Sequence, residues 1–341
     1  MAYTQQVLGN TGCLFLRGSC IPFYEIRKKE WILLDSGPRF VRQEQEAFLQ
    51  EQEIRIRAVV CSHAHFDHTE NNRYLQQTQG ARIVMSALDA GMVQDATSLK
   101  ACFYSYSGQE NERYNREMLC KADQIFLPWQ GEEGDWQEKR TDAVRQEQKA
   151  DSGFQGWEEG KTVRERRENR NMRIQVEGVS LQVLPLPGHA ASHVGFVTPD
   201  GVAYLADSVF SPDSSGRERL TYMLDWTRAL KTLEAVREFS CHGYILAHGG
   251  VYQEIRSVAE ENLERFGRMM DGFGQLFAEE ITQEELLEKA GKRYHLSLES
   301  YEKICLTERV IRSMTEYLVE RGRVRRAVRG GRLVYGPGEM P

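Results

Sequence analysis

Short apolar runs separated by turn residues dominate the first part of the chain. The runs are rich in β-branched and aromatic residues, which is typical of strands. A charged turn at 27–30 separates two of the runs, and turn residues at 35–38 end the second, so these two runs are expected to pair as a hairpin. We predict strands at 13–17, 21–26, 31–35, 56–61 and 82–85, and helices at 41–53 and 70–79.

The stretch from about 131 to 173 breaks this pattern. It is dense in charges of both signs, in Gln and in Gly, and it has few aliphatic residues. Such a segment cannot bury enough apolar surface to form a core of its own. We therefore expect a charged insertion that lies outside the main core.

The pattern of strands and helices resumes after the insertion and then changes again near residue 252. We predict strands at 172–176, 179–184, 194–198, 202–205 and 244–247, and helices at 225–238, 282–290 and 307–320. The chain ends in an arginine-rich hairpin at 323–335 with a Gly330-Gly331 turn. Helices followed by a basic hairpin resemble a small winged-helix module. We therefore predict a main domain at 1–251 and a helical, winged-helix-like region at 252–341.

Composition narrows the class of protein without naming a function. Of the 341 residues 40% are hydrophobic and 28% are charged, which is typical of a globular protein. No apolar run approaches the roughly 18 residues that cross a bilayer, so no membrane partner is expected. The net charge of −6 argues against a general electrostatic grip on nucleic acid.

Cysteine usage and the start of the chain favour a cytoplasmic protein. The seven cysteines are scattered and odd in number, without a C-x-x-C pair, which fits reduced thiols better than a disulfide framework. The first residues show neither the basic start nor the apolar segment of a secretory signal.

The segment after the predicted strand at 56–61 carries the densest chemistry in the chain. It reads His63-Ala64-His65-Phe66-Asp67-His68 and uses three of only eight histidines. Imidazole nitrogen and carboxylate oxygen are ligands that zinc takes. A cluster of this kind is costly for a purely structural loop, because buried imidazoles and carboxylates need partners.

Three more ligand-type residues stand where a predicted strand gives way to a loop. They are His189, Asp207 and His248, and a glycine adjoins two of them, at Gly188 and Gly249. This recurrence is what we expect if several strand ends converge on one site.

The motifs follow one another in the order H-x-H-x-D-H, P-G-H, a strand-terminal Asp, and a strand-terminal His before Gly. In this order they resemble the motifs of the metallo-β-lactamase superfamily, which includes hydrolases like glyoxalase II. The turn that contains Asp35 also resembles one found early in that family. The likeness covers roughly the first 250 residues, apart from the insertion. It implies an α/β fold of αββα sandwich type.

The resemblance also implies a centre of two metal ions, most simply two zinc ions, with iron or manganese as alternatives. His63, His65 and His189 would hold the first ion and Asp67, His68 and His248 the second, with Asp207 between them. The two ions would share a hydroxide that acts as nucleophile, and Asp67 would be the catalytic residue that orients it. His193 is expected to support a ligand or its loop rather than to bind metal.

Two positions depart from the usual family pattern. Ala247 precedes His248 where a glycine is common, and Ala206 precedes Asp207 where a glycine is also common. Both replacements are small residues, so we expect them to change fine geometry rather than ligation.

Four functions stay open at this point. The complete ligand set favours hydrolysis of a small ester, thioester, lactone or amide. An endoribonuclease or phosphodiesterase is the main alternative, with RNA bound by the arginines of the terminal hairpin. An iron-dependent persulfide or oxygen redox enzyme and a non-catalytic, metal-stabilised binding module are the other two. Whether the protein forms oligomers is also open.

Overall fold

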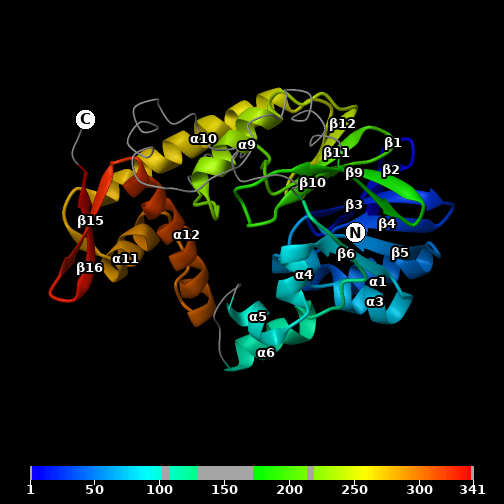
Figure 1. The fold of residues 1–341 in the computed structure, drawn as a ribbon, viewed down its shortest axis with the longest axis horizontal. Helices are drawn as coiled ribbons and strands as arrows, with labels where there is room; N and C mark the ends of the chain where they lie inside the picture. The colour runs from blue at the N-terminus through cyan, green and yellow to red at the C-terminus, as the bar shows by residue number, and fades with distance from the viewer. Residues whose placement is uncertain (1, 102–107, 129–171, 213–218, 339–341) are drawn as a thin grey trace, which may run out of the picture.

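A computed structural model describes residues 2–101, 108–128, 172–212 and 219–338, and the fold is drawn in Figure 1. The charged insertion predicted at about 131–173 therefore lies almost entirely outside the described residues. Two β-sheets face each other in this structure, and helices cover the outer face of each sheet. In the residues that the structure describes, no helix is both long and apolar enough to cross a membrane.

The first sheet contains seven strands in the order of the sequence. β1 to β4 form an antiparallel meander, and β4 to β7 run parallel to one another. The strands are β1 (Tyr3–Leu8), β2 (Thr11–Leu16), β3 (Ser19–Arg27), β4 (Glu30–Leu34), β5 (Arg55–Val60), β6 (Arg82–Ser86) and β7 (Gln124–Phe126). The helices of this half are η1 (Arg39–Val41), α1 (Arg42–Glu51), α2 (Phe66–Thr69), α3 (Asn72–Gln79), α4 (Ala87–Val93), α5 (Ala96–Leu99) and α6 (Gly108–Met118).

The second sheet contains six strands in the order β13-β12-β11-β10-β9-β8. β11 and β12 are parallel, so their carboxyl ends meet at the same edge of the sheet, and α9 connects them. The elements are β8 (Arg173–Val176), β9 (Val179–Pro185), β10 (Val194–Val197), β11 (Val202–Ala206), α9 (Trp226–Val236), β12 (Gly243–Leu246) and β13 (Gly250–Tyr252).

Alternation of side chains along the strands creates the layers. In β4, Leu33 packs toward the helices of the first half, whereas Ile32 and Leu34 pack between the sheets. In β11, Tyr204 packs between the sheets and Leu205 packs toward α9. Three apolar clusters result, one between the sheets and one under each helical layer, which confirms the predicted αββα sandwich.

In the described residues, the C-terminal region adds three α-helices, one short 3-10 helix and a three-stranded sheet of order β14-β16-β15. Its elements are α10 (Arg256–Gly274), η6 (Gln275–Phe277), β14 (Ile281–Thr282), α11 (Gln283–Arg293), α12 (Tyr301–Glu320), β15 (Val324–Arg329) and β16 (Arg332–Pro337). One apolar cluster runs from Trp226 of α9 through Phe266 of α10 to Leu318 of α12. The domain boundary at 251/252 stays a prediction, and the core itself continues across it.

Most of the predicted elements are present, and the largest differences concern helices. The sequence pattern placed the last helix at 307–320, but α12 begins at Tyr301 because the side chain of Ser300 caps it by accepting from the backbone N–H of Lys303. The pattern also missed α4, α5 and α6. Two of these are no longer than seven residues, so their apolar positions show no clear helical period.

Candidate metal centre

The predicted site residues all lie at the carboxyl ends of strands. His63 and His65 follow β5, and Asp67 and His68 lie in the short helix α2 that continues this loop. On the other sheet, His189 follows β9, Asp207 follows β11 directly, and His248 follows β12. The two facing sheets therefore bring segments that are far apart in the sequence to one edge of the sandwich.

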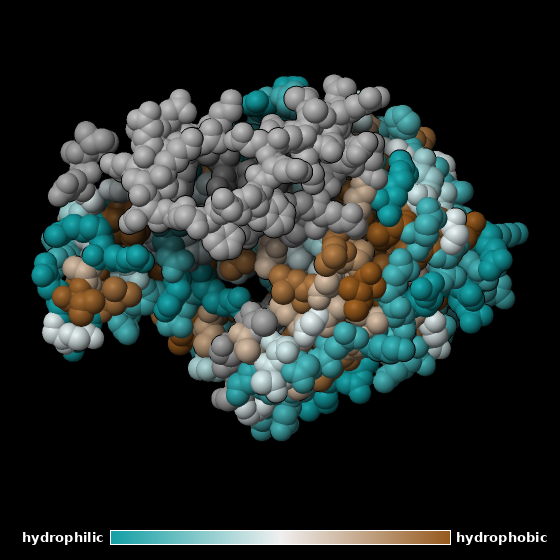
Figure 2. All heavy atoms as spheres, viewed as in Figure 1, coloured by the Kyte–Doolittle hydropathy of each residue, from teal (hydrophilic) through white to brown (hydrophobic). Residues whose placement is uncertain are grey.

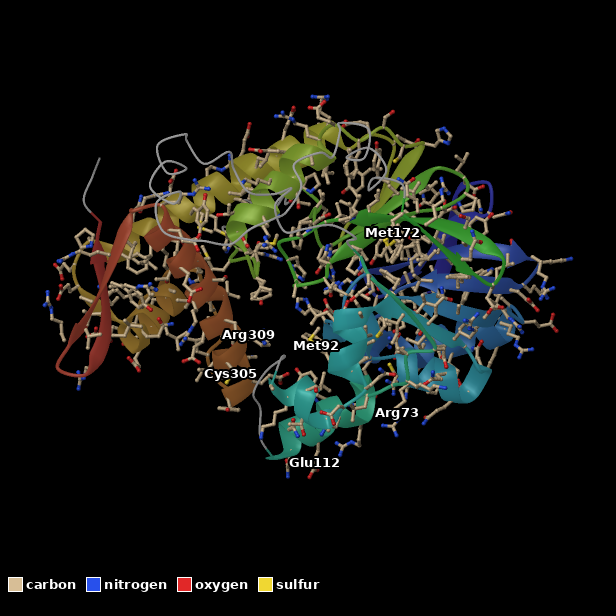
Figure 3. The ribbon with its side chains drawn as sticks, in the orientation of Figure 1. Arg73, Met92, Glu112, Met172, Cys305 and Arg309 are labelled. Atoms are coloured by element: carbon tan, nitrogen blue, oxygen red, sulfur yellow. The ribbon has the colours of Figure 1, made fainter. Side chains whose placement is uncertain are left out.

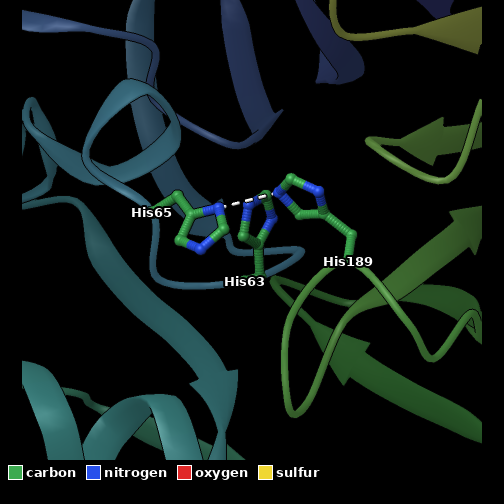
Figure 4. Close-up of side chains that lie close together, drawn as sticks. All are labelled: His63, His65 and His189. Atoms are coloured by element: carbon green, nitrogen blue, oxygen red, sulfur yellow. Dashed lines mark hydrogen bonds between the residues drawn. The ribbon is translucent and has the colours of Figure 1, made fainter. Parts of the chain in front are cut away.

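The seven side chains form two adjoining groups. His63, His65 and His189 make the first group, and their nitrogens lie within 4.8 Å of one another. Figure 4 shows this group, in which His65 Nδ1 is 2.8 Å from His189 Nε2. The second group, with the same 4.8 Å limit, consists of Asp67, His68, Asp207 and His248.

Asp207 lies where the two groups meet. Its Oδ2 is 3.3 Å from His189 Nε2 in the first group and 3.4 Å from His68 Nε2 in the second. Its Oδ1 is 3.5 Å from His248 Nε2. The structure thus brings together every residue that the sequence predicted as a ligand, and their binding of metal stays a prediction.

Hydrogen bonds outside the site fix how the imidazoles point. His189 Nδ1 donates to the Tyr222 carbonyl at 3.1 Å, and His68 Nδ1 donates to Asp35 Oδ2 at 2.8 Å. A proton held on Nδ1 leaves the lone pair of Nε2 facing the centre of the site. These two side chains are therefore oriented as a metal ligand would be.

Three buried polar atoms at the centre have no hydrogen-bond partner. They are His63 Nε2, His68 Nε2 and Asp207 Oδ1. Buried polar atoms in folded proteins are nearly always paired, so three in one place require an explanation. A cation would satisfy all three, and a set of imidazole nitrogens and carboxylate oxygens fits zinc. The residues present therefore fit the metal centre that the motifs imply.

Electrostatics divide the site into two halves. Burial and the neighbouring imidazoles lower the pKa of His63 well below its usual value, and burial likewise lowers the pKa of His65 and of His189. The first group is thus neutral near pH 7, the state in which imidazole binds metal.

In the second group the carboxylates favour a positive charge. Asp207 raises the pKa of His248 to about 10, against the effect of burial. Burial alone would lower the pKa of His68, but Asp207 and Asp67 raise it well above its usual value. A proton supplies the positive charge here, and a bound cation would replace it with release of that proton.

The side chain of Asp35 supports the candidate site through hydrogen bonds. It is buried, and its carboxylate accepts from four donors: the Ser62 backbone N–H at 2.7 Å, Ser62 Oγ at 2.6 Å, His68 Nδ1 at 2.8 Å and Tyr204 Oη at 2.6 Å. Asp35 itself has a φ of +66°, a conformation that short polar residues tolerate better than most. This carboxylate ties the first sheet, the histidine loop and the second sheet together.

His193 and Asp89 hold the loops that carry the ligands. His193 Nε2 accepts from the backbone N–H of Asp207 at 3.1 Å, and its Nδ1 donates to the Leu186 carbonyl at 2.9 Å. Asp89 Oδ2 accepts from Ser192 Oγ at 2.7 Å, and the Asp89 carboxylate also accepts from the backbone of Ala64. Sequence reasoning placed His193 in a supporting role and missed Asp89, because nothing local to Asp89 points to the site.

Ala206 stands directly before Asp207, at a position where the family commonly has glycine. Its φ is +46°, in the left-handed region that glycine adopts at no steric cost. The departure from the family pattern therefore falls at a position where the backbone favours glycine. The bend that turns Asp207 out of β11 forms with alanine all the same.

Replacing Gly188 with alanine is expected to destabilise the fold by about 2–3 kcal/mol and to weaken metal binding. Gly188 has a φ of +132°, and an added Cβ would lie 2.4 Å from the backbone of Ala229 in α9. The loop cannot move away without shifting His189, because the Gly188 carbonyl accepts from the N–H of Asp225 at 2.9 Å. Chemical denaturation and metal titration measure the two effects.

Gly178 provides the matched control for this substitution. It also has a positive φ, +81°, but an added Cβ would meet nothing within 4 Å. Gly178→Ala is expected to cost about 1 kcal/mol and to leave metal affinity unchanged. If Gly188→Ala and Gly178→Ala lowered the free energy of unfolding equally, contact with α9 would not be what holds the His189 loop.

Comparisons with known proteins agree with this geometry. A family model described as the metallo-beta-lactamase superfamily matches residues 22–248, a range that contains all seven side chains of the site. A search of curated proteins found no match.

Solved structures with the same fold cover nearly the whole chain. A metallo-beta-lactamase family protein from Thermus thermophilus is 17% identical, with a TM-score of 0.60 over 94% of this chain and 93% of its own. A beta-lactamase domain protein from Burkholderia ambifaria is 13% identical, with a TM-score of 0.61 over 98% of this chain and 93% of its own. At such identities the likeness shows the fold alone. Together with the family match, it shows that this chain belongs to the metallo-beta-lactamase superfamily.

Proposed function

We propose that this protein is a hydrolase with two zinc ions that acts on a small ester, thioester, lactone or amide. The observation that supports this most is the convergence of seven ligand-type side chains around buried atoms without hydrogen-bond partners. In this proposal His63, His65 and His189 hold one ion, and Asp67, His68 and His248 hold the other. Asp207 contacts both groups and would serve both ions.

Two bound cations would polarise the group under attack and lower the pKa of water. The protein's own contribution is to hold the ligand side chains in place and to orient the attacking oxygen. Asp67 is the partly exposed carboxylate of the centre, with 27% of its side chain accessible, whereas Asp207 has 6%. Asp67 Oδ2 lies 3.3 Å from His248 Nε2. We propose that the Asp67 carboxylate accepts a hydrogen bond from the attacking hydroxide and orients it.

The C-terminal region supports a small substrate over RNA. Its order of elements, α10-β14-α11-α12-β15-β16, is the order of a winged-helix module, and we propose that classification. Such modules usually present their second helix-turn-helix element to nucleic acid. Here that element is α12, and its Glu302 is paired with Arg113 of the first half. This end of the helix is thus held against α6 of the first half.

The arginines of the terminal hairpin are also partly engaged. Arg325 and Arg329 both contact Glu280, at 3.3 Å and 3.5 Å, and Arg323 contacts Asp271 at 3.0 Å. These pairs reduce the positive charge that the hairpin offers to phosphates. We therefore propose a small-molecule partner, and a cytoplasmic location in keeping with the scattered cysteines.

Elemental analysis of the purified, untagged protein, followed by a hydrolysis panel, tests this proposal. The expected result is about two zinc ions per chain and hydrolysis of at least one thioester, lactone or amide, lost on chelation and restored by zinc. RNA in the same panel tests the phosphodiesterase alternative. One iron ion per chain without hydrolysis would instead favour redox chemistry, and a metal-free protein would favour a binding role.

A further inference from the structure

The loop that begins at Asp207 is held by the C-terminal region, and we call its described residues, 207–212, the Asp207 loop. Asn262 of α10 binds both polar groups of the Phe210 backbone in this loop. Asn262 Oδ1 accepts from the Phe210 N–H at 3.0 Å, and Asn262 Nδ2 donates to the Phe210 carbonyl at 2.8 Å. The same Nδ2 donates to the Val258 carbonyl, one turn earlier in α10, at 2.8 Å, which fixes the orientation of the amide. We refer to this arrangement as the clamp.

The clamp is buried where α10 packs against the second half of the sandwich. Only 1% of Asn262 is exposed, and beside it the rings of Phe210 and Phe266 pack edge to face with 6.2 Å between their centres. Figure 3 shows α10 lying alongside α9 and leading to α11 and α12. Figure 2 shows the surface hollowed between the C-terminal elements and the first half. The apolar cluster shared with α9, by contrast, joins α10 firmly to the second sheet.

The Asp207 loop carries the restraint of the clamp to His248. Ser211, next to Phe210 in the sequence, donates from its Oγ to the His248 carbonyl at 3.0 Å. The two segments also touch at Gly249, where an added Cβ would lie 2.8 Å from the Cβ of Ser211. Because the segments are packed this closely, a displacement of Ser211 would be transmitted to the backbone of His248.

His248 depends on this backbone support more than two of the other imidazoles do. The Nδ1 atoms of His68 and His189 are each held by a group outside the metal centre. Among the described residues, the ion pairs of His248 are with Asp67 and Asp207, which belong to the centre itself. The His248 side chain is also 44% exposed, so surrounding side chains restrain it little.

Asp207 itself has supports that do not involve the clamp. Its N–H donates to His193 Nε2 at 3.1 Å, and the neighbouring Ser208 Oγ donates to the Leu205 carbonyl at 2.7 Å, which closes the turn at the end of β11. Loss of the clamp would therefore leave Asp207 in place and release the part of the loop that touches His248. The effect should fall on the second proposed metal position, which His248 helps to form.

We propose that Asn262 is a positioning residue that sets how tightly the second zinc ion is held, acting through the Asp207 loop and the backbone of His248. The inference rests on the proposed function, because it requires two ions, and it places the control of one of them in the C-terminal region. A support that is already formed before the metal binds lowers the cost of ordering the ligand. Removing a group that orients a metal ligand typically lowers metal affinity by roughly 10–100-fold.

Competition with a chromophoric zinc chelator tests the proposal without relying on turnover. The full-length protein as purified, saturated with zinc, is brought to equilibrium with increasing chelator, which gives a dissociation constant for each ion. Asn262→Leu removes the whole clamp, and Asn262→Asp keeps its acceptor but loses its donors. In both variants one ion should be held about 10–100-fold more weakly than in the wild-type protein, and the other within about threefold of it. Ser211→Ala, which removes the hydroxyl bonded to His248, should weaken the same ion.

His248→Ala identifies the ion that responds. This variant is expected to hold only the first ion, so adding Asn262→Leu to it should leave the affinity for that ion within about threefold. In the Asn262→Leu/Ser211→Ala double variant, the loss of affinity should be smaller than the product of the two single losses, because both substitutions act through the same loop.

Met314→Ala is the matched control for a general loss of stability. Met314 is fully buried in α12 and belongs to the same apolar cluster as α10, outside the clamp. The cavity that the substitution leaves should make the protein easier to denature and should leave both zinc affinities unchanged.

Wild-type affinities for both ions in a folded Asn262 variant would overturn the proposal. So would an equal loss at both ions, or a loss in Met314→Ala as large as that in Asn262→Leu. Ser211 is partly exposed, so Ser211→Ala serves if the Asn262 variants do not fold, and wild-type affinities in it would also overturn the proposal. A wild-type protein with fewer than two zinc ions contradicts the proposed function and this inference together, whereas two ions with unchanged affinities in the variants contradict only the role of Asn262.

Discussion

Asp207→Ala is expected to remove bound metal and hydrolytic activity together. Asp207 contacts His189 in one group of ligands and His68 and His248 in the other, so its loss affects both proposed metal positions. Loss of a residue that merely supports a ligand lowers metal affinity by roughly 10–100-fold, and the loss of a shared ligand should exceed that. Metal content by elemental analysis and hydrolysis of the best substrate in the panel are the two measurements.

His242→Ala is the control for this substitution. His242 is exposed, and its Nδ1 lies 2.8 Å from the Asp200 carbonyl, outside both groups. It should keep the wild-type metal content and activity. An Asp207→Ala protein with two metal ions and full activity would rule out the proposed centre.

Asp35→Ala is expected to lower the free energy of unfolding by about 3–5 kcal/mol, because the substitution leaves buried donors without an acceptor. The four donors come from Ser62 and His68, in the segment that follows β5, and from Tyr204 of β11 in the other sheet. Metal affinity should also fall by roughly 10–100-fold, since His68 loses the group that orients it. Chemical denaturation and metal titration measure the two losses.

Tyr204→Phe separates the two effects. It removes one donor to Asp35 and leaves the bond between Asp35 and His68 intact. We expect a loss of about 1–3 kcal/mol in stability and little change in metal affinity. If Asp35→Ala were no more destabilising than Tyr204→Phe, the carboxylate would not be the junction described above.

The sequence identified the residues that converge at the candidate centre because their signal is local. His63 to His68 stand in one short segment, and His189, Asp207 and His248 each follow a strand that its β-branched residues reveal. The residues around them carry no such signal. Asp89 is 103 positions from its partner Ser192, and Tyr222 holds His189 through a backbone carbonyl that any residue could supply.

The sequence analysis also missed the short helices and the contacts with the C-terminal region. The capping residues Ser86 and Asp95 mark the starts of α4 and α5, and this signal was available in the sequence. The approach of Arg309 to Tyr222 was not, because it depends on how α12 packs against the sandwich. Contacts of this kind depend on tertiary packing, whereas the signal for the candidate metal centre lies in local motifs.

The apolar cluster that runs from α9 through α10 to α12 makes the two parts of the chain a single folding unit. If the chain were cut after β13, α9 would lose the neighbours that cover Trp226 and would expose that apolar surface to water. The C-terminal region is in this sense not a removable accessory. Exchanging the whole region for another would require the helical layer of the second sheet to be repacked.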